Sequence, residues 1–341
     1  PPDLPTRVLK TLKAADQGAL RLKSTSTFED HRGTWLHDVL WWIAACLIAL
    51  IITGIPSVLR ACARQIGNDR LTWGIIALGV MVRLVVEARM IEFGIGVMLT
   101  DYAQHLIMPR YGPSVPALHH GLFLIFGSDH EVVLLAHRVL GCLMLPLTVA
   151  GGLALFPKVH SAHRWFAPIW AFGLAFTPML VRAEATESNL QPALFAFWFG
   201  LVAWMLTQGR MRLLATIGGL GFAMLARPEL VLIVPAAWLL LCRPWAESLK
   251  ATLTIGACLT AIAPFQLTHI LQRTLWEVSA SSLAFDGPFF RYHLWVHLGE
   301  TALIEPRIAP LATPLLALVA LAWVRDGRAR IWSLALGGLT W

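Results

Sequence analysis

The sequence has few charged residues. Asp, Glu, Lys and Arg together make up 14% of its 341 residues, where a soluble domain has about a quarter. Hydrophobic residues make up 57%, and they form long continuous runs. This composition excludes an ordinary soluble domain and predicts an all-α, polytopic helical membrane protein.

Cysteine is also scarce, and no two cysteines stand in a CxxC or CxxH spacing. All of them lie in or beside apolar runs: Cys46, Cys62, Cys142, Cys242 and Cys258. The sequence therefore predicts neither a disulfide framework nor a zinc knuckle.

The net charge of +7 is carried between the apolar runs, which indicates anchoring and orientation in a membrane and not nucleic-acid binding. A basic polar or amphipathic leader, residues 1–34, precedes a transmembrane domain, 35–341, which we expect to be truncated at its C-terminus. About nine or ten spans are expected, at 36–59, 71–90, 133–156, 165–181, 190–207, 213–227, 230–242, 251–271 and 310–324, with 331–341 cut short. Two alternatives stay open: Gly54 and Pro56 could break the first span, and 213–242 could form one kinked unit.

The short connectors predict the orientation of the chain. Segments 60–70, 157–164, 208–212, 243–250 and 325–330 are basic and should be cytoplasmic. The outer loops 91–132 and 272–309 then share the extracytoplasmic side with the turns at 182–189 and 227–229. We expect a polytopic protein of a prokaryotic inner or plasma membrane.

The first outer loop carries chemistry-bearing residues. Asp101, Tyr102 and His105 come before a Pro/Gly turn, and His119 and His120 follow it. A loop of this length is usually functional or disordered, and this one is too aliphatic and aromatic for a disordered linker.

Further charges fall on the same predicted side: Arg138, Arg182, Glu184, Glu187, Arg227 and Glu229. Charges at membrane depth usually face a cavity or a partner. Guanidinium groups bind phosphate, and a carboxylate can take a proton from a hydroxyl. These charged residues together suit a substrate that carries both a phosphate and a hydroxyl.

The order in which these loops, turns and charged residues follow one another along the chain resembles the GT-C glycosyltransferases that use dolichyl- or polyprenyl-phosphate sugars. The relatives meant are the protein mannosyltransferases and the aminoarabinose transferases. The resemblance covers about 71–242. It rests on Arg83, on Asp101, and on the stretches YGPSVPALHHGLFLIFG, AHRVLGCLMLPLTVAGG and FTPMLVRAEATESNLQPALFAFW. The chain departs from the pattern where many relatives have a second acidic residue, at Thr100, and where an Arg is expected, at Thr186.

The resemblance implies an inverting transfer of a sugar from a polyprenyl-phosphate donor to an acceptor at the extracytoplasmic face. Asp101 would be the general base. Substrate-binding roles would fall to Arg138, Arg182, Glu184, Arg227, Tyr102, His105 and His119. The implied partners are the polyprenyl-phosphate-linked sugar, membrane lipids and other membrane subunits, with no nucleic acid.

The residues also allow other interpretations. Asp101 could cap the helix that begins at Tyr102. The arginines could reach lipid headgroups or pair with nearby glutamates. No cofactor is firmly implied and no metal ligand is assigned, although the loop histidines could hold a divalent metal. The alternative function is a non-catalytic GT-C-like subunit packed within a larger membrane complex; a transporter would be expected to show an inverted repeat, which the sequence lacks.

Overall fold

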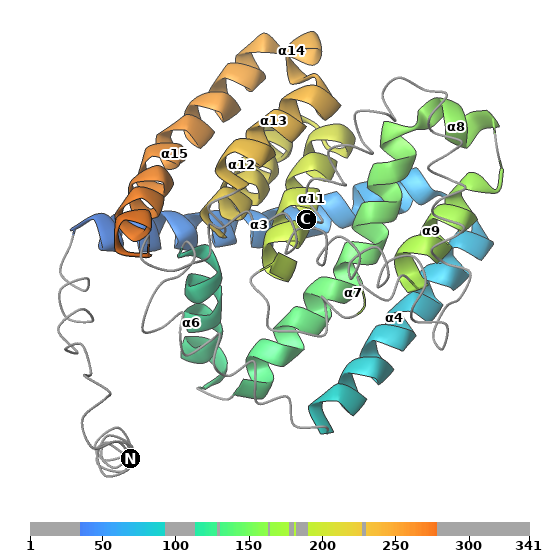
Figure 1. Ribbon diagram of the computed structural model, residues 1–341. Helices are drawn as coiled ribbons and strands as arrows, with labels where there is room; N and C mark the ends of the chain where they lie inside the picture. Colours follow the sequence, from blue (N-terminus) through green and yellow to red (C-terminus); the bar gives the residue numbers. More distant parts are fainter. Residues whose placement is uncertain are drawn as a thin grey trace, which may run out of the picture. The chain divides into compact units, whose positions relative to one another are not determined.

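The computed structural model describes residues 35–92, 113–127, 130–162, 164–176, 181, 190–226 and 230–277. Every regular element in these ranges is a helix (Figure 1), as the composition predicts. The chain divides into two compact units, Pro1–Val39 and Leu40–Trp341, and all the packing described below lies in the second. The helices are α3 Trp35–Ile66, α4 Arg70–Glu92, α6 Ser114–Phe126, α7 His130–Leu155, α8 Pro157–Ala162, α9 Phe166–Phe176, α11 Leu190–Leu206, α12 Gly209–Ala226, α13 Leu230–Cys242, α14 Pro244–Glu247 and α15 Leu249–Glu277.

Each expected span that falls within the described residues coincides with a helix. Two segments, Val39–Ile66 in α3 and Glu131–Leu155 in α7, are long and apolar enough to cross a membrane. The other apolar helices found among the described residues are shorter, at 10–17 residues. The expected spans at 310–324 and 331–341 lie outside the described residues, so the number of spans stays a prediction.

Neither Gly54 nor Pro56 breaks α3, which runs unbroken for 32 residues. Gly54 instead allows close packing, because a β-carbon there would lie 2.9 Å from the β-carbon of Ala215 and 3.0 Å from the ring of Phe199. Small residues at such crossings let helix backbones approach one another. The interpretation of these two residues as helix breakers is therefore wrong.

The stretch 213–242 forms two helices and not one kinked unit. α12 ends at Ala226 and α13 begins at Leu230. The ring of Trp238, late in α13, lies 5.6 Å from the ring of Trp204, late in α11. α12 and α13 therefore run in opposite directions on either side of 227–229, the predicted turn, which itself lies outside the described residues.

The contacts between helices give the bundle two ends. Only Thr207 and Gln208 separate α11 from α12, so these helices pack antiparallel. They do so closely: a β-carbon at Gly219 would lie 2.5 Å from the carbonyl oxygen of Ala196. α7 runs parallel to α11, with His137 beside Gln191 near their starts and Gly151 against Val202 further along.

We call the two ends the basic end and the loop end. At the basic end, α3, α7, α11 and α13 finish and the helices that follow each of them begin, joined by the short basic connectors. At the loop end, α7, α11 and α13 begin, and α4, α9 and α12 finish. The connectors 93–112, 177–189 and 227–229 attach at the loop end, so the segments that were predicted to share one side do attach to one end.

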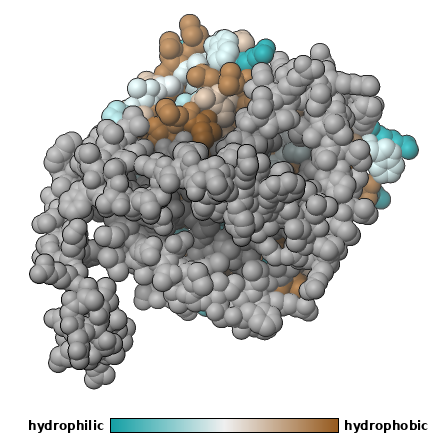
Figure 2. Space-filling view, in the orientation of Figure 1, coloured by the Kyte–Doolittle hydropathy of each residue, from teal (hydrophilic) through white to brown (hydrophobic). Residues whose placement is uncertain are grey.

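The bundle is apolar on its outside and carries polar groups inside. On α4, Thr72 and Arg83 are buried, whereas Leu78 and Met81 are 55% and 57% exposed. Over the described residues, Figure 2 shows hydrophobic patches among polar residues at the top of the view, where Figure 1 draws α13, α14 and α15. A surface helix of a soluble protein presents polar residues on its outer face. The reversed pattern suits a bundle surrounded by lipid or by other helices.

Arg83 ties α4 to the last turn of α9. Its guanidinium donates to the carbonyl oxygens of Leu174 and Ala175, at 3.2 and 2.9 Å, and to Gly79 in its own helix at 3.2 Å. The last carbonyls of a helix lack intrahelical partners and carry its negative dipole end. Arg83 thus has a structural contact with α9. Its i,i+4 spacing from Glu87 also predicts an ion pair along one helix, and this stays a prediction because the Glu87 side chain lies outside the described residues.

Candidate functional site

Two of the predicted site residues lie within the described structure, His119 on α6 and Arg138 on α7. The others lie outside the described residues: Asp101, Tyr102, His105, Arg182, Glu184 and Arg227. Their segments nevertheless attach to described helices at the loop end. The candidate site is therefore built from the side chains that those helices bring together there.

At the centre of this end, His119 of α6 meets His137 of α7. Their Nε2 atoms lie 3.1 Å apart, and their ring centroids are 5.3 Å apart. Both side chains are buried, at 2% and 1% exposure. At this distance a hydrogen bond joins the two rings, with one Nε2 as donor and the other as acceptor according to their tautomers.

Gln191, in the first turn of α11, fixes His137 from the other side. Its side-chain nitrogen donates to the carbonyl oxygen of His137 at 2.7 Å, and the residue is 1% exposed. Among the described residues its amide oxygen has no hydrogen-bond partner. Gln191 therefore joins α11 to α7 next to the histidine pair and leaves one buried acceptor.

Ser114 holds the start of α6 on α12. Its hydroxyl donates to the carbonyl oxygen of Phe222 at 3.0 Å, and the side chain is fully buried. Phe222 lies one turn before the end of α12. Together with the His119–His137 contact, this bond fixes the helix that follows the Asp101 segment.

The last turn of α6 is apolar and exposed. Leu124, Ile125 and Phe126 in its last turn are each more than 60% exposed. His120, next to the buried His119, is exposed and meets the ring of Trp41 edge-on at 5.7 Å. Adjacent positions on a helix point in different directions, so the two histidines have separate environments, as expected for neighbours in sequence.

No group of three or more His, Cys, Asp or Glu side chains that could hold a metal is present among the described residues. Two imidazole nitrogens would supply two of the four ligands that zinc usually takes.

Sequence reasoning missed three residues of this cluster: Ser114, His137 and Gln191. A signal was present for two of them, because His137 and Gln191 are polar side chains inside otherwise apolar runs. Such residues usually face the bundle interior. Arg138, which was predicted, follows His137 directly and is half-buried.

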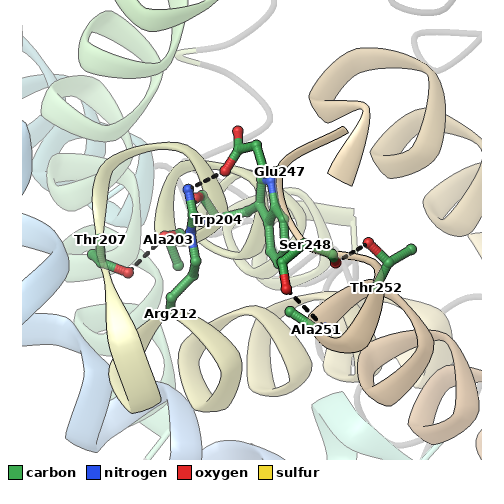
Figure 3. Close-up of polar contacts among 8 residues, drawn as sticks. All are labelled: Ala203, Trp204, Thr207, Arg212, Glu247, Ser248, Ala251 and Thr252. Atoms are coloured by element: carbon green, nitrogen blue, oxygen red, sulfur yellow. Dashed lines mark hydrogen bonds and ion pairs between the residues drawn. The ribbon is translucent and has the colours of Figure 1, made fainter. Parts of the chain in front are cut away.

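A second polar cluster lies at the basic end (Figure 3). Arg212 pairs with Glu247 at 2.7 Å, donates from Nε to the carbonyl oxygen of Trp204 at 2.6 Å, and lies 4.5 Å from the centre of the Trp204 ring. It links α12 to α11 and α14. This cluster holds the three helices together at the end of the bundle opposite to the predicted substrate residues His119 and Arg138.

No protein family, curated protein or solved structure matches the chain. The GT-C resemblance therefore rests on the sequence features alone, and the activity it implies stays a prediction.

Proposed function

We propose that this chain is a polytopic membrane protein of the GT-C type that transfers a sugar from a polyprenyl-phosphate donor to an acceptor at the loop end of its bundle. The loop end would face the extracytoplasmic side. The observation that carries the proposal is the convergence at this end of a buried polar cluster, His119, His137 and Gln191, with the attachment points of every segment that holds a predicted substrate residue.

The membrane part of the proposal is supported by the reversed polarity of the bundle. Leu78 and Met81 of α4 and Leu232 of α13 are exposed, while Arg83, His137 and Gln191 are buried. Polar side chains in membrane bundles face inward and bond to one another or to backbone carbonyls. The contacts of Arg83 and Gln191 follow that rule.

In the proposed reaction, Asp101 accepts the proton of the acceptor hydroxyl as its oxygen attacks the anomeric carbon. The bond from that carbon to the phosphate oxygen breaks, and the sugar configuration inverts. Negative charge grows on the departing lipid phosphate, where Arg138, Arg182 and Arg227 would stabilise it. The donor's lipid tail would remain in the bilayer, which explains why a polar reaction would use a membrane fold.

The test measures transfer of labelled sugar from polyprenyl-phosphate donors by the purified full chain in lipid nanodiscs. Asp101→Asn should reduce transfer by at least about a hundredfold, in the range seen when a general base is removed. Asp69→Asn is the matched control, because Asp69 lies at the basic end, where it accepts N–H bonds from Leu71 and Thr72 at the start of α4. Its transfer per folded molecule should equal that of the wild type.

Two results would contradict the catalytic proposal. In one, the wild type shows no transfer with any donor tested and Asp101→Asn gives the same background. In the other, Asp101→Asn keeps full transfer. The first result, with the chain purified in a stable complex with other membrane proteins, would favour the non-catalytic subunit.

A further inference from the structure

The basic end exposes cations that come from separate connectors. They lie in the last two turns of one helix, between two helices or in the first turn of the next helix, and all are exposed: Arg60, Arg64, Arg70, Arg164, Arg210, Arg243 and Lys250. Because the four connectors meet at one end of the bundle, these charges form one surface. We call it the basic surface.

The carboxylates that the structure describes at this end are already engaged. Asp69 accepts hydrogen bonds from the backbone of Leu71 and Thr72, and Glu247 pairs with Arg212. Among the described residues, no carboxylate pairs with a cation of the basic surface. The surface therefore keeps its positive charge toward whatever lies beyond it.

Exposed tryptophans lie beside these cations. Trp165 and Trp245 are 52% and 48% exposed. The guanidinium of Arg164 lies 5.2 Å from the Trp165 ring centre, and Arg243 is two residues before Trp245. An indole with a polar edge beside a guanidinium is typical of the headgroup layer of a membrane.

Exposed aliphatic side chains continue from this surface toward the middle of the bundle. Leu249 and Leu253 of α15 and Leu240 of α13 are more than half exposed. A protein docking on the cations would leave these leucines in water, whereas a bilayer would cover them and the tryptophans together. The occupant that fits is a lipid leaflet with anionic headgroups.

We propose that the basic surface binds the phosphate groups of anionic lipids, and that the protein therefore prefers a leaflet rich in them. The inference rests on the membrane part of the proposed function. Each cation near an anionic membrane surface contributes about fivefold to the affinity. Screening should weaken the preference, because exposed charges interact over about 10 Å at 0.1 M salt.

The experiment compares full-length protein in nanodiscs of phosphatidylcholine alone and of phosphatidylcholine mixed with phosphatidylglycerol. The lipids that remain bound after transfer to detergent are counted by mass spectrometry at low and high salt. The test variant combines Arg64→Gln, Arg164→Gln and Arg243→Gln. The control combines Arg64→Lys, Arg164→Lys and Arg243→Lys, which keeps the charge at the same positions.

We expect the wild type and the lysine variant to enrich phosphatidylglycerol over phosphatidylcholine, and the glutamine variant to lose at least about tenfold of that enrichment. High salt should reduce the enrichment in the first two proteins. Equal retention of both lipids by the wild type, or an unchanged preference in the glutamine variant, overturns this inference and leaves the proposed function intact. A chain that alkaline carbonate extracts from membranes would overturn the membrane assignment itself.

Discussion

At the scale of single residues, the buried polar groups mostly bond to backbone carbonyls. The hydroxyl of Thr148 in α7 and that of Thr207, just after α11, each donate to a carbonyl one turn back, as is common for threonine in apolar helices. Gln191 donates to the backbone of another helix. The His119–His137 contact is different, because each of its partners is a side chain that could be lost by one substitution.

A double-mutant cycle tests the histidine contact. His119→Leu or His137→Leu leaves a buried imidazole nitrogen without its partner, and each should lower the free energy of unfolding by about 1–3 kcal/mol. The double variant should lose less stability than the sum of the two single losses, with a coupling energy of about 1 kcal/mol between the two side chains. Thermal unfolding in detergent measures the stability of the two single variants and of the double variant.

His120→Leu is the control for this cycle. His120 is exposed, and its described ring contact is with Trp41, so its replacement should change stability by no more than about 0.5 kcal/mol. Strictly additive losses in the double variant would mean that the two imidazoles do not stabilise each other.

At the scale of helices, the sequence predicted the existence and approximate bounds of the elements well. A continuous apolar run needs only local information to be read as a helix, and α11 and α13 match the predicted 190–207 and 230–242 within one residue. It predicted α6 less well: Pro113 and Pro116 indicated a turn, yet Pro116 lies inside the first turn of the helix. Proline is tolerated there because first-turn N–H groups have no partner within the helix.

The sequence could not predict which polar residues meet. The i,i+4 spacing of Arg83 and Glu87 predicts an ion pair along α4, and this pair stays a prediction because the Glu87 side chain lies outside the described residues. The Arg83 guanidinium bonds to α9, about ninety residues away along the chain, a contact that no local spacing predicts. A bond of that kind depends on which helices pack together, and one sequence does not determine the packing.

Replacing Arg83 tests its bonds to α9. Arg83→Met keeps much of the volume but leaves the carbonyls of Leu174 and Ala175 without this donor. Hydrogen bonds to charged groups contribute about 1.5–3 kcal/mol each, so we expect a loss of at least about 2 kcal/mol and a lower melting temperature.

Arg70→Met is the matched control for Arg83→Met, because Arg70 is an exposed arginine at the start of the same helix. It should change stability by no more than about 0.5 kcal/mol. Equal melting temperatures for the two variants would mean that Arg83 does not hold α9.

At the scale of the whole molecule, the distribution of polar and apolar side chains bears on whether the bundle lies in a membrane or in water. Composition alone predicted a membrane protein, but length and hydropathy single out only α3 and α7 among the described helices. The packing of the helices adds an independent reason to propose a membrane protein, because the outer face of α4 carries the exposed side chains of Leu78, Met81 and Val85. In water such a face would be an aggregation-prone patch, whereas in a bilayer it is the expected surface.

Leu78→Asp places a charge on this face near the middle of α4. If the face contacts lipid, the substitution costs about 3 kcal/mol of insertion free energy, and the fraction of chain that resists alkaline extraction from membranes should fall several-fold. Leu78→Met keeps the side chain apolar and should leave that fraction unchanged. If the face contacts water instead, Leu78→Asp removes an exposed apolar side chain, so soluble yield rises and the melting temperature stays the same. The two environments thus predict opposite signs for one substitution, and a rise in soluble yield would contradict the assignment of this bundle to the membrane.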